Sequence, residues 1–250
     1  MFMLNHINKL KDNALHLNSL RKFVTNKTFF NAIRVGFKLK ILTKPLSGNV
    51  LVLSPHPDDD VFGCGGTIKI HTESNDSVTV LYFTNGGNKS RRFEAEQACQ
   101  LLGVKKTIFW NYDDNQIKDS KKTVEDLVEI ISKTNPKTIY VPSFTDPHPD
   151  HFLVSLIFRK SLEKVIFTGQ IFSYEVWQPV YANRLICIDS VVNSKKEAIK
   201  AHESQLNNRS YYFAILGLNK YRAGMHSIGE YAEGFFACNK ELYLELTKNI

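Results

Sequence analysis

Residues 49–60 read NVLVLSPHPDDD, a short apolar run followed at once by one histidine and three carboxylates. The run of valine and leucine ends at turn-forming residues, and this pattern predicts a buried strand. Carboxylates are favoured in the first turn of a helix, so the acidic cluster predicts that a helix begins there. A strand that leads directly into a helix predicts an α/β fold.

Apolar runs and helical patterns alternate along the rest of the chain. Further strands are expected over residues 78–83, 107–110, 138–141, 171–177 and 184–188. Helices are expected over residues 61–71, 91–102, 123–132 and 194–204. Because alternation of this kind puts crossover helices between parallel strands, we expect a Rossmann-like, mostly parallel sheet flanked by helices in a single domain.

The charge of the chain is concentrated at its beginning. The formal net charge is +7, yet residues 1–48 alone carry nine basic residues and one acidic residue. We therefore divide the chain into a basic amphipathic extension, residues 1–48, and a catalytic domain, residues 49–250. A nucleic-acid partner is not expected, because the basic residues lie outside the domain that carries the site.

The remaining composition points to the cytoplasm. No apolar run reaches the length of about 18 residues that a membrane span needs, and no signal-peptide pattern begins the chain. The four cysteines are widely spaced and form no C-x-x-C pair, which favours free thiols in a reducing compartment. The sequence does not indicate an oligomeric state.

A second cluster, His148-Pro149-Asp150-His151, also follows an apolar run, residues 137–142. Ligands of open α/β sheets bind outside the carboxyl ends of the strands, where both clusters are expected. Together the clusters offer the two histidines and the carboxylate that a catalytic zinc ion needs, with a further carboxylate as base. Helix capping by the first cluster alone would not explain His56 or the second cluster.

The two clusters, in this order, resemble the motifs of the LmbE-like or PIG-L family of zinc N-deacetylases. The first motif of that family usually reads H-P-D-D-E, so Asp60 departs from it by one methylene. Further blocks resemble the family between and after the motifs: Arg91 to Glu94, Asp114 to Ile117, Tyr174 to Trp177, Lys196 to Gln205 and Tyr231 to Phe235.

The resemblance implies one metal ion per chain, zinc or another divalent ion, held by His56, Asp59 and His151. It also implies that Asp58 is the general base. Arg91 and Asp114 match family positions that contact the substrate, with Arg92 and Asp113 as the adjacent alternatives.

His148 and Asp150 complete the expected catalytic set. A protonated His148 would stabilise the tetrahedral oxyanion and protonate the leaving amine. Asp150 would orient the ring of His148, as carboxylates do for many functional histidines. Trp177 and Tyr174 are candidates for stacking on a sugar, although aromatic residues in strands more often belong to a core. His202 and His226 receive no role.

The expected function is hydrolysis of an N-acyl, most readily an N-acetyl, group on an amino-sugar conjugate of the N-acetylglucosamine type. This substrate class is implied by the resemblance, and the rest of the conjugate is left open. A non-catalytic carbohydrate-binding protein on the same scaffold is one alternative. A non-haem iron oxygenase, which uses the same two-histidine, one-carboxylate ligand set, is the other.

The extension has a helical pattern of its own over residues 28–42. Phe30, Ile33, Phe37 and Ile41 recur at helical spacing, and basic residues fall on another side. Such a helix either packs its apolar face on the domain or makes a peripheral contact with an anionic membrane through residues 27–42. The second possibility would place the protein at the inner face of the membrane.

Overall fold

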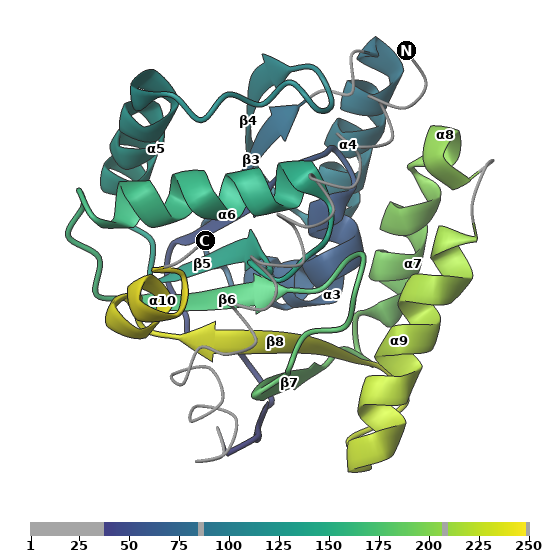
Figure 1. Ribbon diagram of the computed structural model, residues 1–250. Helices are drawn as coiled ribbons and strands as arrows, with labels where there is room; N and C mark the ends of the chain where they lie inside the picture. Colours follow the sequence, from purple (N-terminus) through teal and green to yellow (C-terminus); the bar gives the residue numbers. More distant parts are fainter. Residues whose placement is uncertain (1–37, 85–87, 207–209, 249–250) are drawn as a thin grey trace, which may run out of the picture.

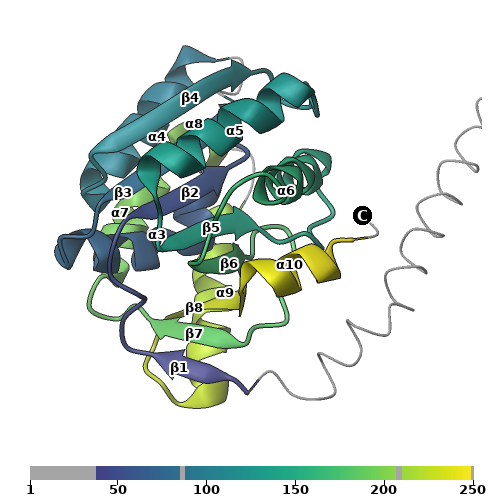
Figure 2. The same cartoon turned by 90° about the vertical axis from the view of Figure 1, so that its left-hand side faces the viewer.

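The computed structural model describes residues 38–84, 88–206 and 210–248, which form one sheet covered by helices on both faces (Figures 1 and 2). The strands are β1 (Lys40–Leu42), β2 (Val50–Ser54), β3 (Val78–Thr84), β4 (Lys106–Tyr112), β5 (Thr138–Pro142), β6 (Gln170–Tyr174), β7 (Arg184–Cys187) and β8 (Ala232–Cys238). The helices are α3 (Asp59–Glu73), α4 (Lys89–Leu102), α5 (Lys121–Thr134), α6 (Pro149–Leu162), α7 (Val192–Lys200), α8 (Glu203–Leu206), α9 (Tyr211–His226) and α10 (Lys240–Leu246).

The strands follow the order β1-β7-β8-β6-β5-β2-β3-β4. β8 is antiparallel to both of its neighbours, and the other pairings are parallel. After β2 the chain continues to β3 and β4 on one side and then returns to β5 on the other. The carboxyl ends of β2 and β5 therefore flank a topological switch point, where open α/β sheets bind their ligands. The predicted single-domain α/β fold with a mostly parallel sheet is confirmed.

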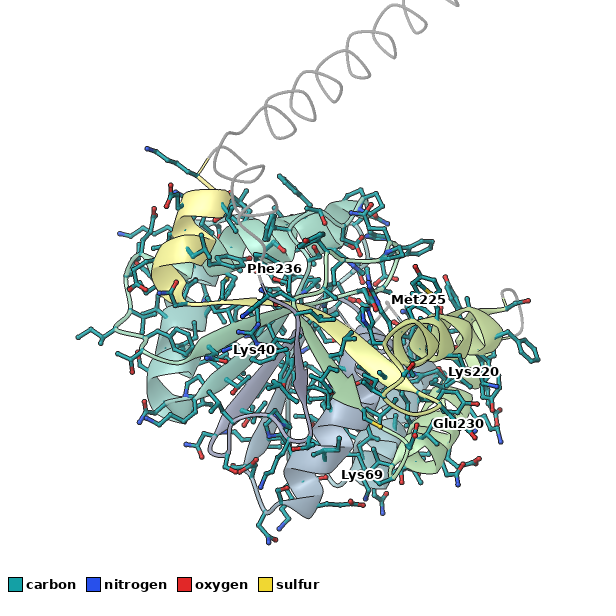
Figure 3. All side chains as sticks on the ribbon, turned by 90° about the horizontal axis from the view of Figure 1, so that it is seen from below. Lys40, Lys69, Lys220, Met225, Glu230 and Phe236 are labelled. Carbon is teal, nitrogen blue, oxygen red and sulfur yellow. The ribbon has the colours of Figure 1, made fainter. Side chains whose placement is uncertain are left out.

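Alternate side chains of β2 enter two separate cores. Val50 and Val52 pack with the face covered by α3, α4, α7 and α9, whereas Leu51 and Leu53 pack with the face covered by α5, α6 and α10. A strand buried on both faces needs apolar residues at every position, which explains the unbroken apolar run in the sequence. Side chains fill both layers, and Lys220 and Met225 mark the exposed side of α9 (Figure 3).

Several predicted boundaries are wrong for identifiable reasons. The strand expected over residues 171–177 stops at Tyr174, because the Glu175 carboxylate accepts the backbone N–H of Val180 and pairs with Arg222, turning the chain away from the sheet. The helix expected over 194–204 is divided into α7 and α8. The helix expected over 28–42 does not reach Lys40–Leu42, which form strand β1 by parallel pairing with β7.

The expected extension is only partly described. Residues 27–37, which carry most of the amphipathic pattern, lie outside the described residues, as do residues 85–87. Within residues 38–84, 88–206 and 210–248, the structure has no helix that is long and apolar enough to cross a membrane.

Helix α3, which carries the first motif, is interrupted at Cys64 (φ −146°, ψ 21°). The buried Glu233 of β8 accepts the backbone N–H groups of Gly66 and Thr67, at 2.8 and 2.7 Å. Lys195 of α7 donates to the carbonyl of Phe62 at 3.1 Å and to Glu233 at 2.6 Å. One buried ion pair thus satisfies the backbone groups that the break leaves without helical partners.

Two glycines allow α3 to lie close to its neighbours. A Cβ atom on Gly63 would come within 2.3 Å of the Tyr174 ring, and one on Gly66 within 2.7 Å of Ile188. Glycine at these positions therefore allows close packing of α3 on its neighbours.

Candidate metal centre and pocket

The two motifs meet at the switch point of the sheet. His56 follows β2, and Asp59 begins α3. His148 is the N-cap of α6, Pro149 occupies its first turn, and His151 lies in the same turn. Because β2 and β5 are paired neighbours, side chains 89 to 95 positions apart in the sequence converge at one place.

Three donor atoms form a small triangle. His56 Nδ1 and His151 Nε2 each lie 3.1 Å from Asp59 Oδ2, and the two nitrogens are 3.3 Å apart. Ligand atoms bound at about 2.0–2.1 Å to a tetrahedral ion lie roughly 3.3 Å from each other. The spacing and the donor types therefore fit a divalent metal ion, for which His56, Asp59 and His151 are candidate ligands.

His148 lies beside this triangle. One ring nitrogen each of His56, His148 and His151 lies within 4.8 Å of the other two. His148 therefore also belongs to a group of side chains that could hold a metal ion. However, its Nδ1 accepts the backbone N–H of Asp150 at 3.2 Å, and its ring is only partly buried and lines the pocket. That bond places the proton of a neutral ring on Nε2.

Each of the two histidines in the triangle has a further carboxylate next to its other ring nitrogen. Asp150 Oδ2 lies 2.9 Å from Nε2 of His56 and also accepts the backbone N–H of Asn115 at 2.8 Å. The expected contact between the Asp150 carboxylate and the ring of His148 is not made. Only the backbone of Asp150 meets His148, because the carboxylate is turned across the switch point toward the first motif.

The second of these carboxylates, Asp146, was not predicted. Its Oδ2 lies 3.3 Å from Nδ1 of His151, and its side chain is fully buried. Asp146 stands two residues before His148 in the same acidic-histidine run, and that proximity was the available signal. Carboxylates in such positions orient metal-binding histidines and fix their tautomer.

The electrostatic field at the triangle favours positive charge. Burial opposes protonation of His56, but the carboxylates of Asp150 and Asp59 outweigh it and raise its pKa to about 10. For His151, the same competition between burial and Asp59 raises the pKa to about 9. The pKa of Asp59 is held below its usual range by the two histidines, despite its burial. A cation is stabilised by the same field.

Asp58 faces the pocket beside the triangle. It occupies the N-cap position of α3 but makes no capping hydrogen bond with its side chain. Its Oδ1 lies 3.8 Å from Nη2 of Arg91, and burial together with the charge of Asp59 raises its pKa to about 6. A carboxylate without a capping role, next to the candidate metal ligands, is positioned to exchange protons with a water molecule bound there.

Asp60, in contrast, points into the protein interior. Its Oδ2 accepts a hydrogen bond from the Tyr82 hydroxyl at 2.9 Å, and its backbone N–H donates to Ser54 Oγ. Burial raises its pKa to about 7. Asp60, the residue that departs from the family motif, therefore stabilises the start of α3 from the protein interior and does not line the pocket.

Arg91 and Asp114 lie together on the pocket wall. Arg91 Nη1 and Asp114 Oδ2 are 2.6 Å apart, and both residues line the pocket. Of the adjacent alternatives, Arg92 pairs with Glu96 at the surface, and Asp113 is exposed and does not line the pocket. The structure therefore favours Arg91 and Asp114 for substrate contact.

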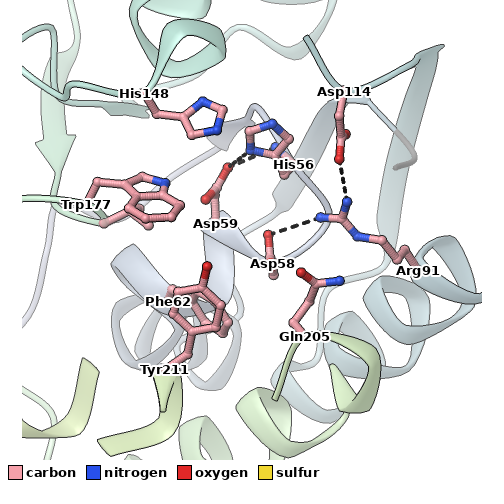
Figure 4. A pocket seen from close by; sticks show the side chains of 11 residues that line it. His56, Asp58, Asp59, Phe62, Arg91, Asp114, His148, Trp177, Gln205 and Tyr211 are labelled. Carbon is pink, nitrogen blue, oxygen red and sulfur yellow. Dashed lines mark hydrogen bonds and ion pairs between the residues drawn. The ribbon is translucent and has the colours of Figure 1, made fainter. Parts of the chain in front are cut away.

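The pocket is lined by residues of both motifs and by several residues outside them (Figure 4). Its lining consists of His56, Asp58, Asp59, Phe62, Arg91, Asp114, His148, Val176, Trp177, Gln205 and Tyr211. Trp177 is 43% exposed and stacks on His148, with ring centroids 5.6 Å apart. Tyr174 belongs to the core, where its hydroxyl donates to the Leu53 carbonyl.

Neither of the two unassigned histidines lines the pocket. His202 is buried in edge-to-face contact with Phe62, and His226 is exposed at the end of α9.

A comparison with protein families agrees with this site. The family model described as PIG-L, GlcNAc-PI de-N-acetylase, matches residues 51–162, a segment that contains both motifs. Residues 51–162 are a PIG-L family segment. The expected blocks from Tyr174 onward lie outside the matched segment.

Individual relatives carry deacetylase names. A diacetylchitobiose deacetylase from Thermococcus kodakarensis is 29% identical over 188 residues, which cover 62% of this chain and 69% of the relative. The structure of the N,N'-diacetylchitobiose deacetylase from Pyrococcus horikoshii superposes with a TM-score of 0.68 at 26% identity, covering 78% of this chain and 85% of that one.

The same fold also occurs in a protein with another reaction. GalB, the 4-carboxy-2-hydroxymuconate hydratase from Pseudomonas putida KT2440, superposes with a TM-score of 0.67 at 23% identity, covering 77% of this chain and 96% of that one. This likeness shows the fold alone, so the chemistry has to be argued from the site.

Proposed function

We propose that this PIG-L family protein is a zinc-dependent hydrolase that removes an N-acetyl group from an amino-sugar conjugate. The observation that carries the proposal is the convergence of His56, Asp59 and His151 on one point, with Asp58 beside them in the pocket. Two nitrogens and one carboxylate oxygen are typical of catalytic zinc, which keeps a further position open for water.

Each side chain has a part in hydrolysis of the amide. A metal ion held by His56, Asp59 and His151 would polarise the acyl carbonyl and lower the pKa of water. Asp58 would accept a proton from the water molecule while the water oxygen bonds to the acyl carbon. When the carbon–nitrogen bond breaks, this proton passes to the amine, so that the products are acetate and the free amino sugar.

His148 would act on the other side of the scissile bond. Because Nδ1 of His148 accepts the N–H of Asp150, the neutral ring carries its proton on Nε2, which can hydrogen-bond to the developing oxyanion. Burial and the neighbouring histidines lower the pKa of His148. We therefore assign neutral His148 to stabilisation of the oxyanion. Of the two roles expected from the sequence, protonation of the leaving amine by a charged His148 is not part of this proposal.

The walls of the pocket suit a sugar. The paired Arg91 and Asp114 offer a donor and an acceptor for ring hydroxyls, and the partly exposed Trp177 offers an aromatic surface. The two chitobiose deacetylases are named for an N-acetylated amino-sugar substrate, which supports the same substrate class here. We assign this activity to residues 49–250, with β1 of the preceding segment joining the sheet.

The alternative functions make different demands on the site. A carbohydrate-binding protein would not need Asp58 beside a metal triangle, and an oxygenase would need oxygen and an oxidisable cosubstrate. A hydratase would add water to a carbon–carbon double bond and release no amine. Amide hydrolysis accounts for both the ligand set and the adjacent carboxylate.

A substrate screen tests the proposal. The full-length protein, loaded with Zn²⁺, is incubated under anaerobic conditions with N-acetylglucosamine, N,N'-diacetylchitobiose and other N-acetylglucosaminides, and acetate and free amine are both quantified. Equal amounts of the two products, abolished by a chelator and restored by Zn²⁺, are expected. Asp58→Asn should lose the activity, and Asp113→Asn, which changes an exposed neighbouring acid, should keep it.

Two results would contradict the proposal. One is stoichiometric binding of these sugars by metal-loaded protein without any release of amine. The other is an activity that requires oxygen.

A further inference from the structure

Asp146 connects three parts of the site through one buried carboxylate. Its Oδ1 accepts the backbone N–H of His148 at 2.9 Å. Its Oδ2 accepts the backbone N–H of Trp177 at 3.2 Å and lies 3.3 Å from Nδ1 of His151. The three partners are an expected metal ligand, the neighbouring catalytic histidine and an aromatic residue of the pocket wall.

The two loops that meet at Asp146 come from adjacent strands. Asp146 lies between β5 and α6, and Trp177 lies just after β6. The loops are also joined near the sheet, where the backbone N–H of Ser143 donates to the carbonyl of Tyr174 at 3.0 Å. Gln178 adds a hydrogen bond from its side chain to the carbonyl of Thr145. These hydrogen bonds hold the loop after β6 against the loop between β5 and α6.

The stacked rings complete the connection. Trp177 lies on the ring of His148 with an interplanar angle of 30°, so the position of the indole depends on both its backbone and His148. Since Asp146 holds the backbone of both residues, it determines where the stacked pair lies relative to His151.

We propose that Asp146 is a positioning residue that fixes the metal ligand His151 and the Trp177 wall of the pocket as one unit. Both of its oxygens are committed, and the side chain has no solvent-exposed surface into which it could turn. A shift of the carboxylate toward one partner therefore lengthens its contacts with the others. Metal binding and the shape of the sugar-binding wall are coupled through this residue.

Asp150 serves as a comparison within the same site. It contacts His56 and the backbone of Asn115, beside Asp114 on the opposite wall. It does not contact Trp177, so a change at Asp150 should weaken metal binding without moving the Trp177 wall. The proposal rests on the metal site of the proposed function but not on the identity of the substrate.

Tryptophan fluorescence provides a readout independent of activity. The chain has two tryptophans, Trp110 and Trp177, so a Trp110→Phe background isolates the signal of Trp177. In this background, titration with Zn²⁺ is expected to change the emission of Trp177. Asp146→Asn should weaken Zn²⁺ binding by about 10–100-fold and abolish this change even at saturating Zn²⁺. Asp150→Asn should weaken binding but retain the change.

A second pair of variants tests the coupling in the other direction and does not alter Asp146. Trp177→Pro removes the indole and the backbone donor, whereas Trp177→Ala removes the indole but keeps the donor. The coupling predicts weaker Zn²⁺ binding by Trp177→Pro than by Trp177→Ala, several-fold in Kd. Asp126→Asn, on the outer side of α5, is the control for loss of a surface carboxylate.

The proposal is overturned if Asp146→Asn binds Zn²⁺ as tightly as the Trp110→Phe parent. It is also overturned if the Trp177 response persists in Asp146→Asn at saturating Zn²⁺, or if the two Trp177 variants bind Zn²⁺ equally. Failure of the proposed function appears differently, as absence of amine release from a protein whose Zn²⁺ binding and Trp177 response are intact.

Discussion

His56 and Asp150, 94 residues apart in the chain, are joined by a 2.9 Å contact between Nε2 of the ring and Oδ2 of the carboxylate. With its proton on Nε2, the neutral imidazole directs the lone pair of Nδ1 toward the point between Asp59 Oδ2 and His151 Nε2 where a metal ion would lie. The second motif therefore does more than supply one candidate ligand, because its Asp150 also sets the tautomer of the candidate ligand His56 in the first motif.

The first prediction concerns the metal ligands. Purified His151→Ala should retain little metal, with an affinity at least about 100-fold below wild type, because one of three converging donors is lost. Elemental analysis after dialysis measures the occupancy. His226→Ala, which changes an exposed histidine at the end of α9, is the matched control and should be fully loaded. Full occupancy of His151→Ala would remove this residue from the ligand set.

The second prediction separates metal binding from catalysis. Asp58→Asn should keep the metal and lower kcat by about 10²–10⁴-fold, because it loses the group that accepts the proton of water. His148→Ala should likewise keep the metal and lower kcat, through loss of the oxyanion donor. Steady-state kinetics with metal content measured on the same samples provides the test. Wild-type turnover in either variant would exclude that residue from the reaction.

The third prediction concerns the break in α3. Glu233→Gln should destabilise the protein by about 3–5 kcal/mol, because it leaves the charge of Lys195 buried without its partner. The double variant Lys195→Met, Glu233→Leu should be less destabilised than the single variant. Urea unfolding measures both, with the exposed Glu230→Gln as control. A single variant as stable as this control would show that the pair does not stabilise the fold.

The fourth prediction follows from His202. Burial, together with the nearby Arg91 guanidinium, lowers its pKa to about 3 in the folded protein. Between pH 6.5 and about 3 the unfolded chain binds a proton here that the folded chain does not. The free energy of unfolding therefore falls with decreasing pH in this window, by about 1.4 kcal/mol per unit from this group.

Urea unfolding over a pH series, with wild type and His202→Gln side by side, tests this statement. The contribution is present above pH 6.5 and is lost as the pH falls, so wild type should show the steeper loss of stability. Parallel curves for the two proteins would contradict the assigned pKa.

The fifth prediction concerns residues 27–42. If the amphipathic pattern makes a membrane contact, the full-length protein should sediment with anionic vesicles more strongly than a chain beginning at Ser47, since each basic residue near the surface contributes about 1 kcal/mol. Equal sedimentation would leave packing on the domain as the remaining explanation of the apolar face. The shortened chain also lacks β1, so its folding is checked first by circular dichroism.

The sequence alone was sufficient for the α/β class, and it predicted candidate metal ligands whose donor atoms lie close together in the structure. The strands over 49–53, 78–83 and 138–141 could be predicted because they are buried on both faces and therefore continuously apolar. The motif residues could be predicted because zinc restricts its ligands to few residue types, and the end of a parallel strand restricts where they occur. An apolar run and a ligand motif at its end are local features, so both can be recognised from residues that are adjacent in the sequence.

Only the tertiary structure decided which groups meet. The partner of Asp150, the place of Asp146 and the exposure of Trp177 depend on how loops from different strands turn toward one another. Glu233 and Lys195 act on α3 from β8 and α7, far along the chain, and no local pattern signals such a contact. The sequence gives each acidic residue the same carboxyl group, but the pKa and the function of that group are set by burial and by the neighbours within hydrogen-bond distance.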